Sequence, residues 1–284
     1  MDFYALPSTA FADHRPWPFH HVTDVDALNR RIAEEAVGAI ESAGRSGHQL
    51  LIITPTGPLD YTCWADLCNR RRVSCAPLTT VSMDEYLDEA SGDLLPLEHP
   101  LSFRRYLQTS FIDHLDPVLR PDPANVHFPD PHDPQRTTAM IEAHGGADLC
   151  YGGFGITGHF AFNDPPEPEE PCDDNDVRDS RTRCVKIMRE SQVQMAMGGS
   201  HGNFAILPRR AVTLGMHELL MSKRIHLTFM RSWHAGVLRR ALFGPVTGRC
   251  PGSFIQAHPN VTVTMTRLAA TLPTINVTQS TGEP

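Results

Sequence analysis

A glycine-rich segment constrains this chain more than any other part of its sequence. It follows the apolar run 147–151 directly and contains Gly152, Gly153, Gly155 and Gly158. Glycine has no Cβ, so the backbone can turn sharply there and pass close to a ligand. His159 and Asp164 come next. A strand, a glycine turn and then acid–base groups are typical of the carboxyl end of a parallel strand, where open α/β folds bind ligands. A glycine-rich surface loop with an incidental histidine is the alternative interpretation.

Apolar runs and helical periodicities alternate along the rest of the chain. The apolar spacing within residues 25–40 predicts a helix that is capped by Thr23 or Asp24 and ends near Ser46. Further helices are expected at 59–69, 101–115, 135–144, 216–221, 232–243 and 253–257. Strands are expected at 49–54, 77–82, 126–128, 147–151, 183–187, 203–207, 225–230 and 261–265. This alternation predicts an α/β fold with a largely parallel sheet and helices on both faces.

The length and the composition favour a single domain with two less regular ends. A chain of 284 residues can bury one large core, and we take 23–274 as one α/β domain. Residues 1–22, rich in proline, aromatic residues and histidine, predict an irregular arm, and 275–284 a flexible tail. The proline- and acid-rich segment 165–183 predicts a mobile loop, which is either a lid over the site or a passive surface excursion.

The net charge and the cysteine pattern limit which binding partners and which cellular compartment we expect. The net charge of −8 argues against nucleic acid or an anionic membrane surface as the partner. No apolar run reaches the ~20 residues that a membrane span needs, and we see no secretory signal. The seven cysteines are odd in number and scattered, as in a cytosolic protein with reduced thiols. They form no zinc-binding pattern, so we expect a cytoplasmic protein without a structural metal.

Two places carry residues suited to proton transfer. Asp84 follows the expected strand 77–82, and a carboxylate in a partly apolar pocket has a raised pKa and can exchange protons. A helix cap or a loop salt bridge is the structural alternative. His159 can accept or donate a proton and Asp164 can orient its ring. A structural hydrogen bond in a buried turn is the alternative interpretation of His159. A metal ion bound by His159 and Asp164 would need a third ligand, and the sequence offers none at a suitable spacing. The sequence has no nucleophile elbow and no Walker lysine.

Three motifs resemble, in the same order, those of the glucosamine-6-phosphate deaminase/isomerase family. They are Met83-Asp84-Glu85-Tyr86, Glu98-His99-Pro100-x-Ser102-Phe103 and Gly152-Gly153-x-Gly155-x-x-Gly158-His159-x-Ala161-Phe162-Asn163-Asp164-Pro165. The resemblance implies a modified Rossmann-like sheet, shared with 6-phosphogluconolactonases, and aldose–ketose chemistry that needs no metal or organic cofactor. It also implies that Asp84 moves a proton between C1 and C2 of the open-chain sugar. His159 would help to open the pyranose ring, assisted by the residues at Thr157 and Asp164.

The sequence departs from that family around His159. Thr157 stands where the family has an aspartate, and a threonine hydroxyl carries no charge at neutral pH. Asp164 is shorter than the family's glutamate. We nevertheless expect the proton-transfer half of the site to be kept, with Asp84, His159 and Asp164 as its catalytic residues. The resemblance predicts substrate contacts at Thr56, Gly57, Glu85, Gly153, Gly155, Thr157, Gly158, Asn163 and His234.

The predicted phosphate site differs even more from the pattern of that family. The family's Thr-Gly-Gly-Thr loop reads Thr56-Gly57-Pro58-Leu59, in which Pro58 lacks an N–H and Leu59 lacks a hydroxyl. The phosphate-binding lysine aligns with His234, and the phosphate-binding arginine has no clear counterpart. The candidate replacements are Arg231, Arg209 and Arg210. We therefore expect a weakened phosphate clamp.

Three functions follow as hypotheses. The first is an aldose–ketose isomerase or deaminase that acts on an aminosugar phosphate or a related sugar. The second is a non-catalytic sugar-binding protein on the same scaffold. The third is a sugar lactone hydrolase in which His159 activates water, which leaves Asp84 without a task. In each case the partner is a small-molecule sugar or sugar phosphate, and the family analogy leaves a homo-oligomer open.

Overall fold

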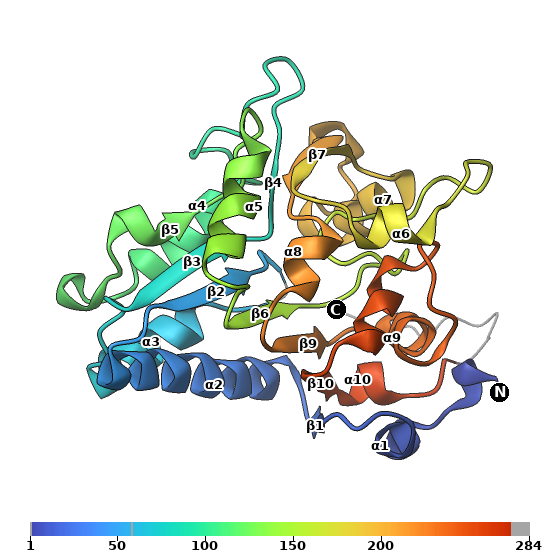
Figure 1. Ribbon diagram of the computed structural model, residues 1–284, viewed down its shortest axis with the longest axis horizontal. Helices are drawn as coiled ribbons and strands as arrows, with labels where there is room; N and C mark the ends of the chain where they lie inside the picture. The colour runs from blue at the N-terminus through green and yellow to red at the C-terminus, as the bar shows by residue number, and fades with distance from the viewer. Residues whose placement is uncertain (1, 58, 274–284) are drawn as a thin grey trace.

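The computed structural model describes residues 2–57 and 59–273, and its main element is a seven-stranded sheet (Figure 1). The strand order is β1-β10-β9-β6-β2-β3-β5, and all neighbouring strands are parallel. The strands are β1 (Phe19–Val22), β2 (Leu50–Thr54), β3 (Leu78–Ser82), β5 (Val126–His127), β6 (Leu149–Gly152), β9 (Ile225–Phe229) and β10 (Val261–Thr266). The predicted α/β fold is confirmed.

Helices cover both faces of this sheet. On one face lie α2 (Val25–Ser46), α3 (Thr62–Arg71) and α4 (Phe103–Leu107). On the other lie α5 (Pro134–Ala143), α8 (Met216–Leu220) and α9 (His234–Phe243). Figure 1 shows α2 below β2 and β3, and α5 and α8 above β6 and β9. Alternate side chains of a strand point to opposite faces, so Ile52 enters the first core while Leu51 and Ile53 enter the second. This double burial explains why β2 reads as a continuous apolar run.

A small antiparallel sheet continues from the carboxyl end of β3. It consists of β4 (Asp84–Tyr86), β8 (Arg210–Thr213) and β7 (Arg183–Lys186), in the order β4-β8-β7. The expected strand 183–187 is β7. The expected strand 203–207 is wrong, because Phe204–Ile206 form a 3-10 helix and the strand is β8 instead. β8 is short and begins with an exposed arginine, so its sequence lacks a clear apolar run.

Several helices differ from the expected ranges. The structure contains α7 (Arg189–Gly199), which the sequence did not predict because its apolar residues do not follow a helical stripe. The expected helix 59–69 begins only at Thr62. The expected helix 101–115 is α4 followed by a π-helical turn, Gln108–Ile112. The other α-helices in the described residues are α1 (Phe11–His14), α6 (Asp174–Arg178) and α10 (Arg267–Ala270), and the expected helix 253–257 lies within a 3-10 helix at Pro251–Ala257.

The N-terminal segment is more regular than the expected arm. β1 pairs in parallel with β10 at the edge of the large sheet, and Phe11 is fully buried. The Arg239 guanidinium, itself buried, donates to the Leu6 carbonyl and lies over the Phe11 ring. These contacts tie residues 6–22 to the main core. The expected flexible tail, 275–284, lies outside the described residues.

The expected mobile loop at 165–183 is attached to the segment around residue 249. Arg249 donates to the carbonyl oxygens of Pro166, Glu167 and Glu170. Asp174, at the start of α6, accepts hydrogen bonds from the Thr247 hydroxyl and the Gly248 N–H. This loop therefore has fixed partners. Among the described helices, none has the length and apolar character needed to cross a membrane.

Candidate active site

The structure places three of the expected site segments at one edge of the large sheet. Thr56 follows β2, Asp84 follows β3 and Gly153 follows β6. These strands are neighbours in the order β6-β2-β3 and run parallel, so their carboxyl ends lie side by side. Gly153 also lies against β9, because a Cβ on it would meet the Thr228 carbonyl oxygen at 2.7 Å. This is the edge at which open α/β sheets bind ligands.

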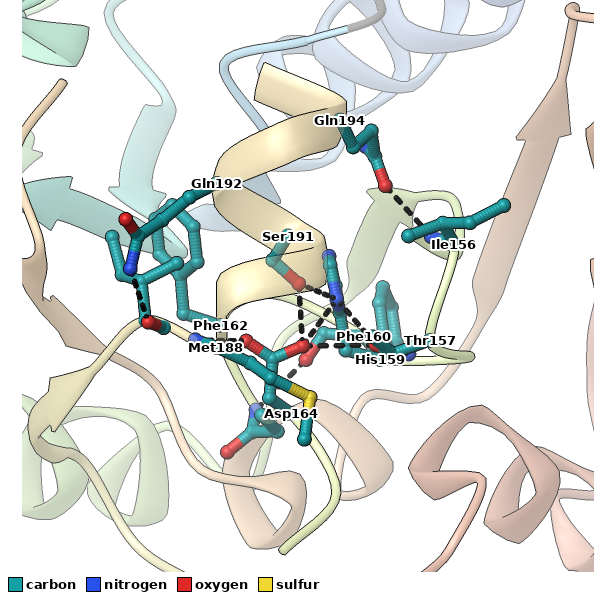
Figure 2. A network of polar contacts seen from close by, with 12 residues as sticks. Ile156, Thr157, His159, Phe160, Phe162, Asp164, Met188, Ser191, Gln192 and Gln194 are labelled. Atoms are coloured by element: carbon teal, nitrogen blue, oxygen red, sulfur yellow. Dashed lines mark hydrogen bonds and ion pairs between the residues drawn. The ribbon is translucent and has the colours of Figure 1, made fainter. Parts of the chain in front are cut away.

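A histidine–carboxylate pair forms the centre of this edge (Figure 2). His159 Nδ1 lies 2.7 Å from Asp164 Oδ1, and both side chains are largely buried. The Thr157 hydroxyl lies 2.9 Å from His159 Nδ1 and donates to Asp164 Oδ1 at 2.9 Å. The Ser191 hydroxyl donates to the same oxygen at 2.6 Å. The Met188 N–H donates to the other carboxylate oxygen at 3.1 Å.

These contacts fix the tautomer of His159. An ionised carboxylate only accepts hydrogen bonds, so Nδ1 carries the proton that it donates to Asp164. Nε2 is then the nitrogen with a free lone pair, and no described residue bonds to it. Burial raises the pKa of Asp164, but His159 and the hydroxyls of Ser191 and Thr157 outweigh burial and leave this pKa below its ordinary value. Asp164 is therefore a stable partner that orients the ring.

Helix α7 supplies two of the groups around this pair. Its Ser191 is fully buried and bonds to Asp164, while the Gln194 side chain accepts the Ile156 N–H at 2.7 Å (Figure 2). The N-cap of α7 is Met188, whose N–H also reaches Asp164. Sequence reasoning missed Ser191 because it missed the helix. A weak apolar pattern and a lone serine gave no signal for either.

The glycine segment is shaped around the imidazole. A Cβ on Gly155 would lie 2.0 Å from both Cε1 and Nε2 of His159, so only glycine leaves the ring this position. Gly158 has a φ of +86°, which side-chain-bearing residues rarely adopt, and a Cβ there would lie 2.5 Å from the Cys250 sulfur. Gly155 therefore leaves room for the His159 ring, and Gly158 lets the turn that precedes His159 pack against Cys250.

Asp84 is a buried carboxylate at the start of β4. It is 7 % exposed, and its carboxylate makes no hydrogen bond with any described residue. Burial, and next to it the neighbouring Glu85, raise the pKa of Asp84 to about 8. A carboxyl group with such a pKa can both take and give a proton near neutral pH. The N-cap or salt-bridge alternative is not what the structure shows.

Glu85 and Asn163, two of the predicted substrate-binding residues, make hydrogen bonds within the protein. The fully buried Glu85 carboxylate accepts the N–H groups of Phe103 and Arg104, the first residues of α4, together with the Ser102 hydroxyl. This joins two of the sequence motifs, 83–86 and 98–103. Asn163 is 1 % exposed and uses its amide to bond the carbonyls of Phe160 and Leu214. The polar groups of both side chains are therefore used in hydrogen bonds within the protein.

Comparison with known proteins shows which family this chain belongs to. No protein-family model matches the chain. Glucosamine-6-phosphate deaminase of Rhodopirellula baltica is 30 % identical over 218 residues, which make up 75 % of this chain and 78 % of that protein. The Caenorhabditis elegans protein of the same name is 28 % identical over 244 residues, 83 % of this chain and 84 % of that protein. This chain belongs to the glucosamine-6-phosphate deaminase family.

Solved structures agree with the fold of a deaminase-family member. A structure described as a monomeric glucosamine-6-phosphate deaminase superposes with a TM-score of 0.75 at 23 % identity, covering 90 % of this chain and 100 % of that one. A 6-phosphogluconolactonase from Thermotoga maritima superposes with a TM-score of 0.60 at 14 % identity, covering 88 % and 99 %. The expectation that deaminases and lactonases share this fold is confirmed.

The phosphate side of the site differs from what the deaminase family resemblance implies. His234 is 5 % exposed, and its Nδ1 accepts the N–H groups of Met230 and Arg231 at 3.0 Å. Burial and the nearby Arg231 lower the pKa of His234 to about 3, so the ring is neutral and cannot replace a lysine charge. Thr56 and Gly57 lie in the loop after β2, while Pro58 lies outside the described residues.

Of the three candidate arginines, Arg231 lies at the same edge of the large sheet as the other site segments. It follows β9 at the carboxyl edge, is exposed, and its Nη2 lies 3.8 Å from the position of a Cβ on Gly198 in α7. Arg209 and Arg210 lie at the start of β8, where Arg210 approaches the loop at Gly92. They are therefore at the far end of the small sheet from Asp84, which pairs with Thr213 at the other end of β8.

Proposed function

We propose that this family member is an aldose–ketose isomerase and deaminase that acts on an aminosugar phosphate of the glucosamine 6-phosphate class. The observation that carries the proposal is the His159–Asp164 pair, which leaves Nε2 of a largely buried imidazole free as a base. Membership of the deaminase family supports it, as do relatives that bear that name. The pKa of about 8 for Asp84 supplies the second proton-transfer group.

Ring opening is the task of His159 in this proposal. Nε2 accepts the proton of the sugar's O1 hydroxyl as the C1–O5 bond breaks, and the proton is returned to O5. The product is the open-chain aldehyde. Asp164 stabilises the transient imidazolium by accepting the Nδ1–H, and Thr157 and Ser191 hold the carboxylate in place. Thr157 is thus a positioning residue, in place of the acid that the family carries there.

Isomerisation is the task of Asp84. Its carboxylate removes the proton from C2 of the open-chain aminosugar while O1 takes up a proton, which gives the enol, and it then returns the proton to C1. The proton gained by O1 is matched by one lost from the 2-amino group, which leaves an imine at C2 and a hydroxyl at C1. Water hydrolyses this imine to the ketose and ammonia. One carboxylate above one face of the chain is sufficient for both transfers. The absence of a hydrogen-bond partner among the described residues leaves both Asp84 oxygens available for this work.

Phosphate binding rests on Arg231 and the Thr56–Gly57 turn in this proposal. Arg231 supplies the positive charge that the neutral His234 lacks. The backbone N–H groups of the turn after β2 can add weaker contacts. A phosphate site with one cationic side chain should give a higher KM for the sugar phosphate than a site with two. The reason is that each charge-assisted hydrogen bond contributes about 1.5–3 kcal/mol.

A sugar lactone hydrolase is the second candidate function. The structural likeness to 6-phosphogluconolactonases and the free Nε2 of His159 favour it, because an oriented imidazole can also activate water. Only the isomerase gives Asp84 a role. The two candidates therefore differ in their response to the loss of Asp84.

The test measures ammonia release and ketose formation from glucosamine 6-phosphate, and hydrolysis of 6-phosphogluconolactone, with the wild type, Asp84→Asn and His159→Gln. We expect deamination in the wild type and its loss in both variants. Lactone hydrolysis that survives Asp84→Asn but not His159→Gln, without any ammonia release, would establish the hydrolase instead. Binding of the sugar phosphate without turnover of either substrate would establish the non-catalytic alternative.

A further inference from the structure

Two histidines and one carboxylate converge at the amino-terminal edge of the large sheet, opposite the edge that carries His159. His48 precedes β2, and His144 and Asp148 precede β6. His144 Nε2 lies 3.0 Å and His48 Nε2 lies 3.2 Å from the same oxygen, Asp148 Oδ2. The three ligand atoms all lie within 4.8 Å of one another. Within the described residues this is the one such group of three.

These spacings match those of a metal site. Zinc binds histidine nitrogen and carboxylate oxygen at about 2.0–2.2 Å in a tetrahedron, which places neighbouring ligand atoms roughly 3.3 Å apart. The two N–O separations here, 3.0 and 3.2 Å, are close to that value without any rearrangement of the side chains. His48 is about half exposed and His144 a quarter, so the fourth position opens to solvent and an ion has a path of entry.

The backbone holds both histidines in place. Gly47 ends α2 with a left-handed φ of 68°, and the N–H of His48 bonds back to the Ala43 carbonyl. His144 is the C-cap of α5, and its N–H bonds to the Met140 carbonyl. Two helix C-termini thus face the cluster, and each carries a partial negative charge that favours a cation.

The carboxylate is also held from outside the cluster. The Leu51 N–H donates to Asp148 Oδ2 at 2.8 Å and Lys223 Nζ to Oδ1 at 2.8 Å. Lys223 fixes the orientation of the carboxylate through the oxygen that does not face the imidazoles, as outer partners of metal ligands do. Its charge also competes with a bound cation, but its side chain is half exposed and can swing into water.

We propose that His48, His144 and Asp148 form a binding site for a divalent transition-metal ion, with Zn²⁺ as the ion that their nitrogen and oxygen atoms fit. The ion would be structural. α2 packs in one core of the sheet and α5 in the other, so a bound ion links helices of opposite faces at the ends of β2 and β6. It would stabilise the folded chain because the unfolded chain does not hold the three ligands together.

The test is a calorimetric titration of Zn²⁺ into the full chain without a histidine tag, alongside His48→Ala, His144→Ala and Asp148→Asn. The matched control is His114→Ala, because His114 Nε2 lies 3.0 Å from Asp66 Oδ1 in a surface pair that has no second histidine. We expect one equivalent of Zn²⁺ to bind the wild type and the control alike. Each cluster variant should lose more than the ~10–100-fold in affinity that an outer-shell partner is worth.

Two further measurements keep the outcome clear. Lys223→Met should bind Zn²⁺ at least as tightly as the wild type, because it removes the competing charge, and Zn²⁺ should raise the Tm of the wild type but not of His48→Ala. His48 is half exposed, so its loss leaves the fold intact even where His144→Ala does not fold. No one-to-one binding, or equal affinity in the wild type and all cluster variants, would overturn the proposal.

Discussion

Asp164 Oδ1 lies 2.7 Å from Nδ1 of His159, and this contact decides which nitrogen of the ring can act on a substrate. The carboxylate receives three hydrogen bonds at that oxygen, from His159, Thr157 and Ser191. It is thereby fixed as an acceptor. The same oxygen explains how the chain orients its histidine with a threonine and an aspartate at positions 157 and 164.

Replacement of Asp164 by asparagine should remove activity without unfolding the protein. An asparagine amide can donate to Nδ1, which moves the ring proton to Nε2 and leaves no free base there. We expect kcat to fall by about 10²–10⁴-fold, the range that a positioned acid–base group contributes. Steady-state ammonia release measures this, and circular dichroism checks the fold. Ser191→Ala, which removes one hydrogen bond and leaves the tautomer, should lose far less. An equal loss in both variants would contradict the tautomer argument.

Gly155→Ala should impair catalysis by displacing the imidazole. The new Cβ would lie 2.0 Å from Cε1 and Nε2 of His159, so the ring must move. A displacement of this size at the reacting group costs about 10²-fold in kcat. The matched control is Gly38→Ala in α2, where a Cβ meets nothing within 4 Å. It should leave kcat unchanged and stabilise the protein by about 0.5–1 kcal/mol. A Gly155→Ala enzyme with wild-type kcat would show that His159 is not the ring-opening group.

Asp84→Asn should raise stability most at alkaline pH. The pKa of Asp84 is about 8 in the folded protein, whereas the ordinary pKa of an aspartate is 3.8, so the folded chain binds more protons than the unfolded chain between these two pH values. The contribution of Asp84 to stability is therefore fully present below about pH 4 and is lost as pH rises to 8, by about 1.4 kcal/mol for each unit of pKa difference.

Thermal unfolding of the wild type and Asp84→Asn between pH 5 and 9 tests this dependence. The Tm advantage of the variant should grow with pH up to about 8 and then level off. The control is Glu169→Gln, which removes an exposed carboxylate in the loop after β6 and should give a small, constant difference. A difference for Asp84→Asn that is independent of pH would show that its carboxylate is not buried and unpaired.

Arg231→Ala should weaken the binding of the phosphorylated substrate specifically. If Arg231 is the cation of the phosphate site, KM for glucosamine 6-phosphate should rise by about one to two decades, the equivalent of one charge-assisted hydrogen bond, while kcat changes little. Arg209→Ala, at the distant end of β8, is the control and should leave KM unchanged. Equal KM values for wild type and Arg231→Ala would place phosphate recognition elsewhere.

The local sequence was sufficient to predict the helices and strands whose apolar residues recur at a regular spacing. The helix that begins after Asp24 and ends at Gly47, and the fully apolar strand β2, were predicted almost to the residue, because a capped amphipathic helix and a doubly buried strand leave strong patterns. The His159–Asp164 pair was predicted for a different reason: the two residues are close in sequence, so a single turn of the chain brings them together.

Only the tertiary structure decided the contacts between segments that are distant in sequence. Ser191 reaches Asp164 because an unpredicted helix, α7, packs over the glycine turn. His234 is neutral because the end of β9 and the start of α9 bury it and occupy its Nδ1. Asp148 meets His48 because two strand starts lie side by side. Burial and electrostatic environment are properties of the packed chain, and the types and spacing of residues do not contain them.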